Sequence, residues 1–158
     1  MTDLPSTPDL VLETLGPEQV WTVYPLISAA DPSITLVGWL RYARRAAGRG
    51  HARRGVLVAR RPALRHPSGA VCYRSERHVR HGVLLTAEHY VALDIVQPEA
   101  VLAALVAGLD RVAETLGCAA IRSVVHGAGA ALADKLREAG HQVEAVTYTR
   151  LLPGAPRS

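Results

Sequence analysis

The sequence predicts an α+β fold of three layers (α/β/α), with helices on both faces of a mixed, mostly antiparallel sheet. Two features lead to this prediction. The patterns along the chain follow the order β-α-α-β-β-β-α-β-α-β, so that three consecutive strands stand between helical segments. One long helix then joins the longest strand to the next strand, and a helical crossover of this kind makes the two strands parallel. The 158 residues suit a single domain over residues 1–158, with a core over about 9–152.

The first elements are a short strand and two helices. Leucines that alternate imperfectly predict a weak edge strand over residues 8–15. A proline and a glutamate in the first turn favour a helix over 16–30, which Pro25 should kink or shorten. Asp31 followed by a proline predicts the cap of a second helix that extends to about Ala47.

Three strands follow. Apolar, β-forming runs over 54–61 and 69–79 flank the turn signal HPSG and predict a hairpin, and the long run over 82–96 predicts the central strand. Residues 98–116 then form the most regular helical pattern of the chain, which ends at Gly117. Its core stripe consists of Leu102, Leu105, Val106, Leu109, Val112 and Leu116.

The C-terminal part predicts a buried strand over 118–126, a short amphipathic helix over 129–140 and a last strand over 142–152. Only the tails, residues 1–8 and 153–158, are expected to be loose.

Charge is unevenly distributed along the chain. Between Arg41 and His81 there are twelve arginines and one acid, Glu76, whereas the remainder has six basic and thirteen acidic residues. One interpretation is a solvated arginine-rich surface, and the other is a face that attracts an anionic substrate or a nucleic acid. The anionic ligand would meet Arg41, Arg44 and Arg45, which share one side of the second helix. Nucleic acid is the less favoured ligand, because few aromatic residues lie among the arginines and no recognition motif is present.

Composition indicates a cytoplasmic protein. The N-terminus lacks the basic and then apolar order of a signal peptide, and no apolar run reaches the ~20 residues of a membrane helix. The two cysteines, Cys72 and Cys118, lie in apolar strand patterns, where they are expected to pack as small hydrophobic residues rather than form a disulfide framework.

The stretch QPEAVL, which joins the central strand to the long helix, resembles the cofactor motif of the GNAT acyltransferase superfamily. That motif has Gln or Arg, two residues, Gly, one residue, and Gly or Ala. Gln97 matches its first position, while Ala100 and Leu102 replace the glycines. The resemblance implies a splayed pair of parallel strands and binding of acetyl-CoA, whose pyrophosphate meets backbone amides at the helix N-terminus. The implied cofactor-binding residues are Leu93, Ile95, Gln97, Glu99, Ala100, Val101 and Leu102.

A second GNAT signature is incomplete. The stretch REAGHQVEAV resembles its end, with Gly140 in register, but Leu136 stands where the family has the tyrosine that protonates the departing thiolate. Gly129 stands at the position of the asparagine that often begins this helix. The usual final hairpin is also shortened to one strand. Tyr148, on that last strand, is the candidate to replace the missing tyrosine.

The resemblance implies an N-acyltransferase, most simply an acetyltransferase, that transfers an acetyl group to an amine. A base must then accept the amine proton, while a backbone amide of the central strand can stabilise the oxyanion. Glu88 and His89 are the natural candidates for the base, but strand alternation would point them to opposite faces, and Glu88 is preferred. His126, at the carboxyl end of the next strand, is a second candidate for the base or for the thiolate acid.

Other readings remain open. The chain could be a non-catalytic module of the same fold that binds a protein or a small ligand, or an anion-binding protein that uses Arg41 to Arg80. No metal site is expected, because the spacing of His78 and His81 suggests metal ligands but no third ligand accompanies them. The resemblance also makes a homodimer plausible.

Overall fold

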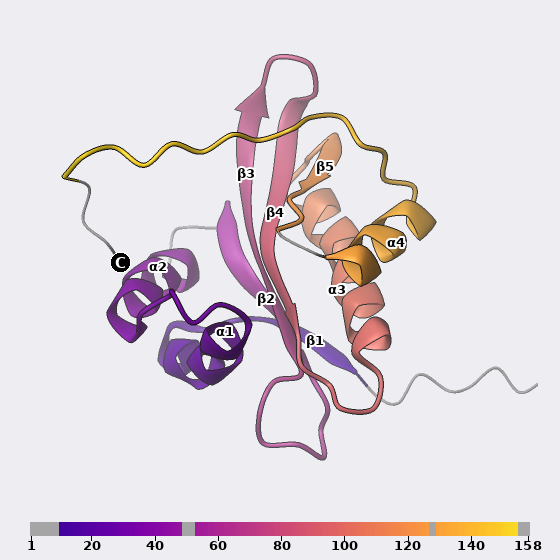
Figure 1. The fold of residues 1–158 in the computed structure, drawn as a ribbon. Helices are drawn as coiled ribbons and strands as arrows, with labels where there is room; N and C mark the ends of the chain where they lie inside the picture. Colours follow the sequence, from indigo (N-terminus) through magenta and orange to yellow (C-terminus); the bar gives the residue numbers. More distant parts are fainter. Residues whose placement is uncertain (1–9, 49–52, 127–128, 155–158) are drawn as a thin grey trace, which may run out of the picture.

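The computed structural model describes residues 10–48, 53–126 and 129–154 of the chain. Five strands form one sheet in the order of the sequence: β1 (Val11–Thr14), β2 (Arg54–Arg60), β3 (Gly69–His78), β4 (Gly82–Ala92) and β5 (Ala120–Ser123). The first four are antiparallel neighbours, and β4 and β5 are parallel. The α+β prediction and the predicted parallel pair are therefore confirmed (Figure 1).

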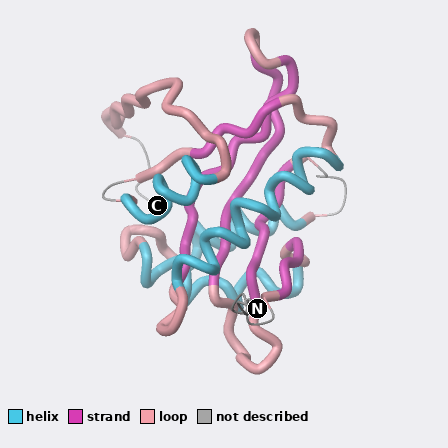
Figure 2. The backbone as a smooth tube through the Cα atoms, turned by 90° about the vertical axis from the view of Figure 1, so that its right-hand side faces the viewer, coloured by secondary structure: helices cyan, strands magenta, loops and turns pink. Residues whose placement is uncertain are grey.

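Helices cover both faces of this sheet. A 3₁₀ helix η1 (Pro17–Val23), α1 (Tyr24–Ala30) and α2 (Leu36–Ala47) lie on one side, and α3 (Pro98–Thr115) and α4 (Ala130–Glu138) on the other (Figure 1). Figure 2 shows α3 running diagonally across the strands. Successive residues of β2 face opposite layers, because strand side chains alternate: Val56 packs in the cluster under α1 and α2, and Leu57 in the cluster under α3.

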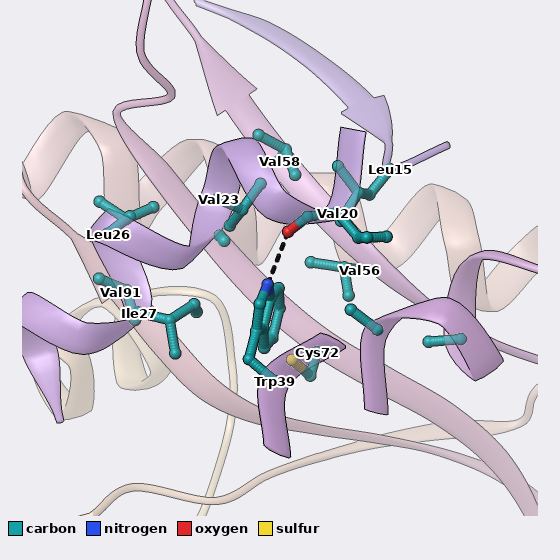
Figure 3. Close-up of a cluster of buried hydrophobic side chains, with 13 residues drawn as sticks. Leu15, Val20, Val23, Leu26, Ile27, Trp39, Val56, Val58, Cys72 and Val91 are labelled. Atoms are coloured by element: carbon teal, nitrogen blue, oxygen red, sulfur yellow. Dashed lines mark hydrogen bonds between the residues drawn. The ribbon is translucent and has the colours of Figure 1, made fainter. Parts of the chain in front are cut away.

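Trp39 anchors the layer formed by η1, α1 and α2. Its ring is 3% exposed, and its indole N–H donates a 2.6 Å hydrogen bond to the backbone oxygen of Val20 in η1 (Figure 3). The bond satisfies the only polar group of a side chain that otherwise packs against Val56 and Cys72 of the sheet. This single residue therefore ties α2, η1 and the sheet together.

The long helix α3 lies very close to the sheet at Gly69, the first residue of β3. A Cβ atom built there would lie 2.4 Å from Cγ1 of Val101 and 2.9 Å from the backbone oxygen of Val91. Glycine is therefore required where the start of β3 passes between β4 and the first turns of α3. This contact fixes the N-terminal end of α3 against the sheet.

The N-terminal helices differ from the prediction in their boundaries. The segment expected to be one helix over 16–30 is a 3₁₀ helix followed by α1, and the change falls just before Pro25. The second helix begins at Leu36 rather than after Asp31, because Thr35 is its cap and accepts a hydrogen bond from the amide of Gly38. Asp31 instead lies in a turn before the helix, where its carboxylate accepts hydrogen bonds from the amide and hydroxyl of Ser33.

The prediction of a last strand of this sheet over residues 142–152 is wrong. The structure describes residues 141–154, and none of them is in a strand. The β-forming sequence is present, but a strand also needs a neighbour for its backbone hydrogen bonds, and this segment has none among the described residues. Of the expected tails, 1–8 and 153–158, residues 153 and 154 are exposed in a turn, and the rest lie outside the described residues. In the described ranges, no helix is both long and apolar enough to cross a membrane.

Candidate functional site

Strands β4 and β5 pair over only part of their length. Their register runs from Leu84 opposite Ala120 to Ala87 opposite Ser123, and the amide of Val124 makes one further bond to the oxygen of Ala87. Strand β4 continues to Ala92 with β3 on its other side but without a β5 partner. The two parallel strands therefore part beyond residue 87, as the resemblance implied.

An irregularity of β4 lies at this point. Ala70 of β3 pairs with Val91, and Cys72 with Glu88, so that β4 has one more residue than β3 in this interval. Such an insertion is a β-bulge. His89, inside the bulge, has φ +58°, a left-handed conformation that non-glycine residues rarely adopt. The bulge interrupts the alternation of side chains along β4.

The prediction that Glu88 and His89 point to opposite faces is consequently wrong. Glu88 offers a carboxylate oxygen, and His89 and His126 each offer a ring nitrogen. These three atoms lie within 4.8 Å of one another. The rings of His89 and His126 stack with centroids 5.3 Å apart, and Nε2 of His89 is 4.0 Å from Oε2 of Glu88. The bulge of β4 and the end of β5 thus bring three proton-accepting groups together. We call these residues the Glu88–His89–His126 cluster.

The carboxylate of Glu88 already has a cationic partner. Nη1 of Arg74, on the adjacent strand β3, lies 2.5 Å from Oε1 of Glu88. This pair holds a positive charge next to the cluster, which opposes the binding of a metal cation. The three groups could still offer a His₂Glu ligand set. The expectation that the chain has no metal site remains a prediction.

The charge of a second acidic residue, Asp31, acts on the two histidines. The pKa of Asp31, at the end of α1, is lowered mainly by hydrogen bonds from the side chain and amide of Ser33, and to a smaller extent by the charges of His89 and His126. Asp31 and Glu88 thus contribute negative charge near the imidazoles from α1 and from the sheet beneath it.

The junction between β4 and α3 has a partly filled anion site. Oδ1 of Asp94 accepts the amides of Val96 and Gln97 at 2.9 and 3.0 Å. Pro98 has no N–H, so the amides of Glu99 and Ala100 are the two in the first turn of α3 that have no acceptor among the described residues. Two backbone donors and the positive end of the helix dipole remain at the helix N-terminus.

Asp94 is held firmly in this position. Its carboxylate lies 2.6 Å from Nε of Arg61, and its side chain is 5% exposed. The hydrogen bond from the Gln97 amide, followed by the bond to Arg61, lowers the pKa of Asp94 below its ordinary value. Asp94 stands three residues before Gln97 and was not among the residues predicted to bind the cofactor.

The residues predicted to bind the cofactor divide into exposed and buried positions. Leu102 replaces the second glycine of the motif. It packs with Val106 and the α4 residues Leu132 and Leu136, so its side chain is directed to the core. Val101 is buried, and Ala100 is half-buried. The other predicted contacts are exposed: Leu93, Ile95, Gln97 and Glu99.

Tyr148 does not join the cluster. It is 92% exposed in the C-terminal segment, and no hydrogen bond ties it to another described residue. A tyrosine that sequence reasoning missed, Tyr90, lies nearer to the parting of the strands, where its hydroxyl is 2.7 Å from Oγ of Ser123 on β5. Burial raises the pKa of Tyr90 to about 12, so this phenol keeps its proton at neutral pH.

The cysteines have the surroundings of packing residues. Burial raises the pKa of Cys72 to about 12 and also raises that of Cys118. A thiol whose pKa is raised carries little thiolate at neutral pH and is a poor nucleophile.

Four arginines of the arginine-rich stretch form ion pairs with acids in three dimensions. Arg60 pairs with Glu13, Arg61 with Asp94, Arg74 with Glu76 and Glu88, and Arg80 with Glu144. Most of these acids come from outside the stretch. Arg41, Arg44 and Arg45 are exposed on α2 and form no ion pair with a described residue. Arg53, Arg54, Arg65 and Arg77 are also exposed and form no ion pair with a described residue, so cationic surface remains both on α2 and outside it.

Several solved structures with the same architecture are those of acetyltransferases. Aminoglycoside N-acetyltransferase AAC(6')-Iy in complex with CoA superposes with a TM-score of 0.76 at 14% identity, covering 94% of this chain and 98% of the other. Ribosomal-protein-alanine N-acetyltransferase from Brucella melitensis biovar Abortus 2308 gives 0.72 at 12% identity, covering 91% and 99%.

An aminoglycoside acetyltransferase from an uncultured soil metagenomic sample, in complex with sisomicin, gives a TM-score of 0.73 at 11% identity, covering 90% and 96%. By sequence, the chain matches no protein-family model and no curated relative. The mixed five-stranded sheet, the parted parallel pair and these superpositions lead to one conclusion: the chain has the GNAT acetyltransferase fold.

Proposed function

We propose that the protein is an N-acyltransferase that transfers an acetyl group from acetyl-CoA to a cationic amine. The observation that carries the proposal is the Glu88–His89–His126 cluster at the place where β4 and β5 part. A base is needed there, because the attacking amine must lose a proton during acyl transfer. Three proton-accepting side chains on a bulge and a strand end, on a fold shared with acetyltransferases, support this reaction over simple ligand binding.

His126 is proposed as the general base, with His89 stacked on it. Imidazole changes its charge between about pH 5 and 8, which suits proton transfer at neutral pH. Glu88 is already paired with Arg74, so its proposed part is to stabilise the imidazolium that forms when the amine proton is taken. A backbone amide of the β4 bulge is proposed to stabilise the oxyanion.

Acetyl-CoA is proposed to lie with its pyrophosphate at the N-terminus of α3. The free amides of Glu99 and Ala100 would donate to the phosphate oxygens, with the helix dipole adding to the attraction. The packing of Leu102 into the core supports this position, because its side chain is directed to Leu132 and Leu136 of α4. When bound, acetyl-CoA supplies the activated acetyl thioester.

The acceptor is proposed to be a positively charged amine, because the negative charge of Asp31 acts on both imidazoles and is in no ion pair with a described residue, whereas the charge of Glu88 is balanced by Arg74. Aminoglycosides are reasonable probes of this class, since two structural neighbours are aminoglycoside acetyltransferases. A panel of aminoglycosides, polyamines and neutral aromatic amines, assayed by release of the free thiol of CoA, tests the proposal. Turnover of cationic amines in preference to neutral ones is expected, and the activity should survive a chelator.

Binding of acetyl-CoA is tested separately by titration calorimetry and thermal shift. A dissociation constant between about 1 μM and 1 mM is expected, the range in which enzymes commonly bind their substrates. No heat and no stabilisation at millimolar acetyl-CoA would overturn the proposal.

One observation favours a second candidate, a non-catalytic ligand-binding module. Asp94 occupies two amides of the β4–α3 junction and places a negative charge beside the proposed phosphate position. A protein of this kind would bind a panel amine without binding acetyl-CoA, so the same two titrations separate the candidates.

A further inference from the structure

The Glu88–His89–His126 cluster has the composition of a metal site as well as that of a base. It offers one carboxylate oxygen and two ring nitrogens within 4.8 Å of one another, and no other group of three histidines, cysteines or acids among the described residues comes as close. Two imidazoles and a carboxylate, with one position left open, are a ligand set that zinc takes in proteins. His78 and His81, whose spacing suggested metal ligands, belong to no such group in the described part of the chain.

The carboxylate of Glu88 has one oxygen available for an ion. Its Oε1 accepts a hydrogen bond from Nη1 of Arg74, whereas its Oε2 lies toward His89, 4.0 Å from Nε2 of that ring. Carboxylates that bind a metal are commonly hydrogen-bonded by a second group that fixes their orientation. Arg74 therefore orients this ligand, although it also brings a positive charge near the ion.

Acidic residues offset that positive charge. Oε2 of Glu76 lies 3.4 Å from Nε of Arg74, and Oε1 of Glu76 lies 3.6 Å from Arg122. Asp31 adds a negative charge that acts on both histidines and is in no ion pair with a described residue. Three ionised acids (Asp31, Glu76 and Glu88) and two arginines leave one net negative charge around the neutral imidazoles. This balance favours a divalent cation.

The ligand atoms lie slightly farther apart than they would around a bound ion. Zinc bonds of about 2.0–2.2 Å in a tetrahedral arrangement place neighbouring ligand atoms about 3.3–3.5 Å apart, so each side chain has to move by less than about 1 Å. The two rings stack at 13°, and one has to turn so that both nitrogens point at one ion. His126 is exposed and the side chain of His89 is 43% exposed, so both rings have room to turn.

We propose that the Glu88–His89–His126 cluster binds a zinc ion and that zinc inhibits acetyl transfer by occupying the base. The ion would take Oε2 of Glu88 and one nitrogen of each histidine, with a water molecule in the fourth position. While the ring nitrogen of His126 is bound to zinc, its lone pair cannot accept the proton of an amine. Zinc is thus an inhibitor rather than a cofactor, and the reaction needs no metal. The inhibition rests on the proposed function, whereas the binding of zinc does not.

A metal site was not expected from the sequence, because the bulge that gathers the ligands leaves no mark in the periodicity of β4. The strained backbone of His89 supports a site of this kind. Residues in sparsely populated conformations persist where the surrounding structure holds them, and they are frequent in ligand sites.

Titration of the full, untagged chain with cobalt(II) tests the site, because cobalt replaces zinc in such sites and its visible absorption reports the coordination geometry. Chelator-treated protein should bind one equivalent, which zinc should displace. Glu88→Gln, His89→Asn and His126→Gln should each weaken binding at least tenfold, since each removes one of three ligands. Asparagine is chosen at 89 because it tolerates a left-handed backbone. The matched control, His78→Gln with His81→Gln, should bind as wild type does.

Inhibition is measured by the acetylated product rather than by the free thiol of CoA, which itself binds zinc. Zinc should raise the KM for the amine more than that for acetyl-CoA, and a chelator should restore the rate. His89→Asn keeps the proposed base and should require at least tenfold more zinc for the same inhibition. Wild-type protein that binds no cobalt, binding unchanged in His126→Gln, or binding lost in the His78 and His81 control would overturn the metal site.

The two proposals fail in different ways. If the cluster binds zinc but the chain transfers no acetyl group to any amine, the proposed function and the inhibition fail, while the metal site stands. If the chain is an active acetyltransferase that binds neither cobalt nor zinc, the metal site fails and the proposed function stands.

Discussion

The left-handed backbone of His89 is the residue-scale feature on which the candidate site depends. A histidine at φ +58° costs conformational energy of order 1–3 kcal/mol, which the surrounding sheet must offset. In return, the bulge directs His89 toward His126 and leaves Glu88 next to Arg74. A regular strand would have placed one of the two side chains on the opposite face. The strained residue and the clustered titratable groups therefore have the same origin.

Replacing His126 with glutamine tests the proposed base. His126→Gln should lower kcat for acetyl transfer by about 10²–10⁴-fold, because glutamine cannot accept the amine proton. The KM for acetyl-CoA should change little, since the cofactor is proposed to bind at α3. His89→Gln should have a smaller effect, and His66→Gln, at an exposed position, should have none. A fall in kcat of less than threefold for His126→Gln would remove it from the reaction.

Replacing Asp94 with asparagine tests the effect of its charge on stability separately from the effect on acetyl-CoA binding. The pKa of Asp94 is lowered in the folded state, so its ionised form stabilises the fold above the ordinary pKa of about 4 and this stability is lost as pH falls through the lower value. Asp94→Asn should therefore reduce the free energy of unfolding at pH 7 by about 1–3 kcal/mol, with a smaller difference from wild type at pH 3. Urea unfolding at the two pH values measures this.

The same substitution should tighten the binding of acetyl-CoA. Removing a negative charge beside the proposed phosphate position is expected to improve affinity about threefold to tenfold at low salt, and less at high salt. Calorimetric titrations of wild type and Asp94→Asn at two salt concentrations check this. Equal affinities would place the phosphates elsewhere.

At the scale of elements, the contact between β3 and α3 sets the position of the proposed cofactor site. Gly69→Ala should destabilise the protein by about 1–3 kcal/mol, because the added methyl group meets the backbone oxygen of Val91 as well as Val101 in α3. It should also weaken acetyl-CoA binding by shifting the first turn of α3. Gly16→Ala is the matched control, because its Cβ meets nothing within 4 Å and should leave both quantities unchanged. Chemical denaturation and calorimetry measure the two effects, and equal stabilities of the variants would contradict the tight contact.

Periodicity predicted most elements because their burial repeats regularly. The strands at 54–61 and 69–79, the long helix and its core position Leu102 all agree with the structure to within a few residues. The α2 start was misplaced because a threonine cap and an Asp turn lie four residues apart, and sequence alone does not rank them. The bulge at His89 could not be predicted, since an extra residue in a strand shows only when the register with β3 is known.

At the scale of the whole molecule, folding pairs four arginines of the basic stretch with acids that lie far from them in the sequence. Arginines of the basic stretch meet acids from β1, β4, the junction before α3 and the C-terminal segment. The last strand, residues 142–152, was predicted wrongly, because the β-forming pattern of a segment does not encode which neighbour its backbone pairs with. That error concerns which distant surfaces meet.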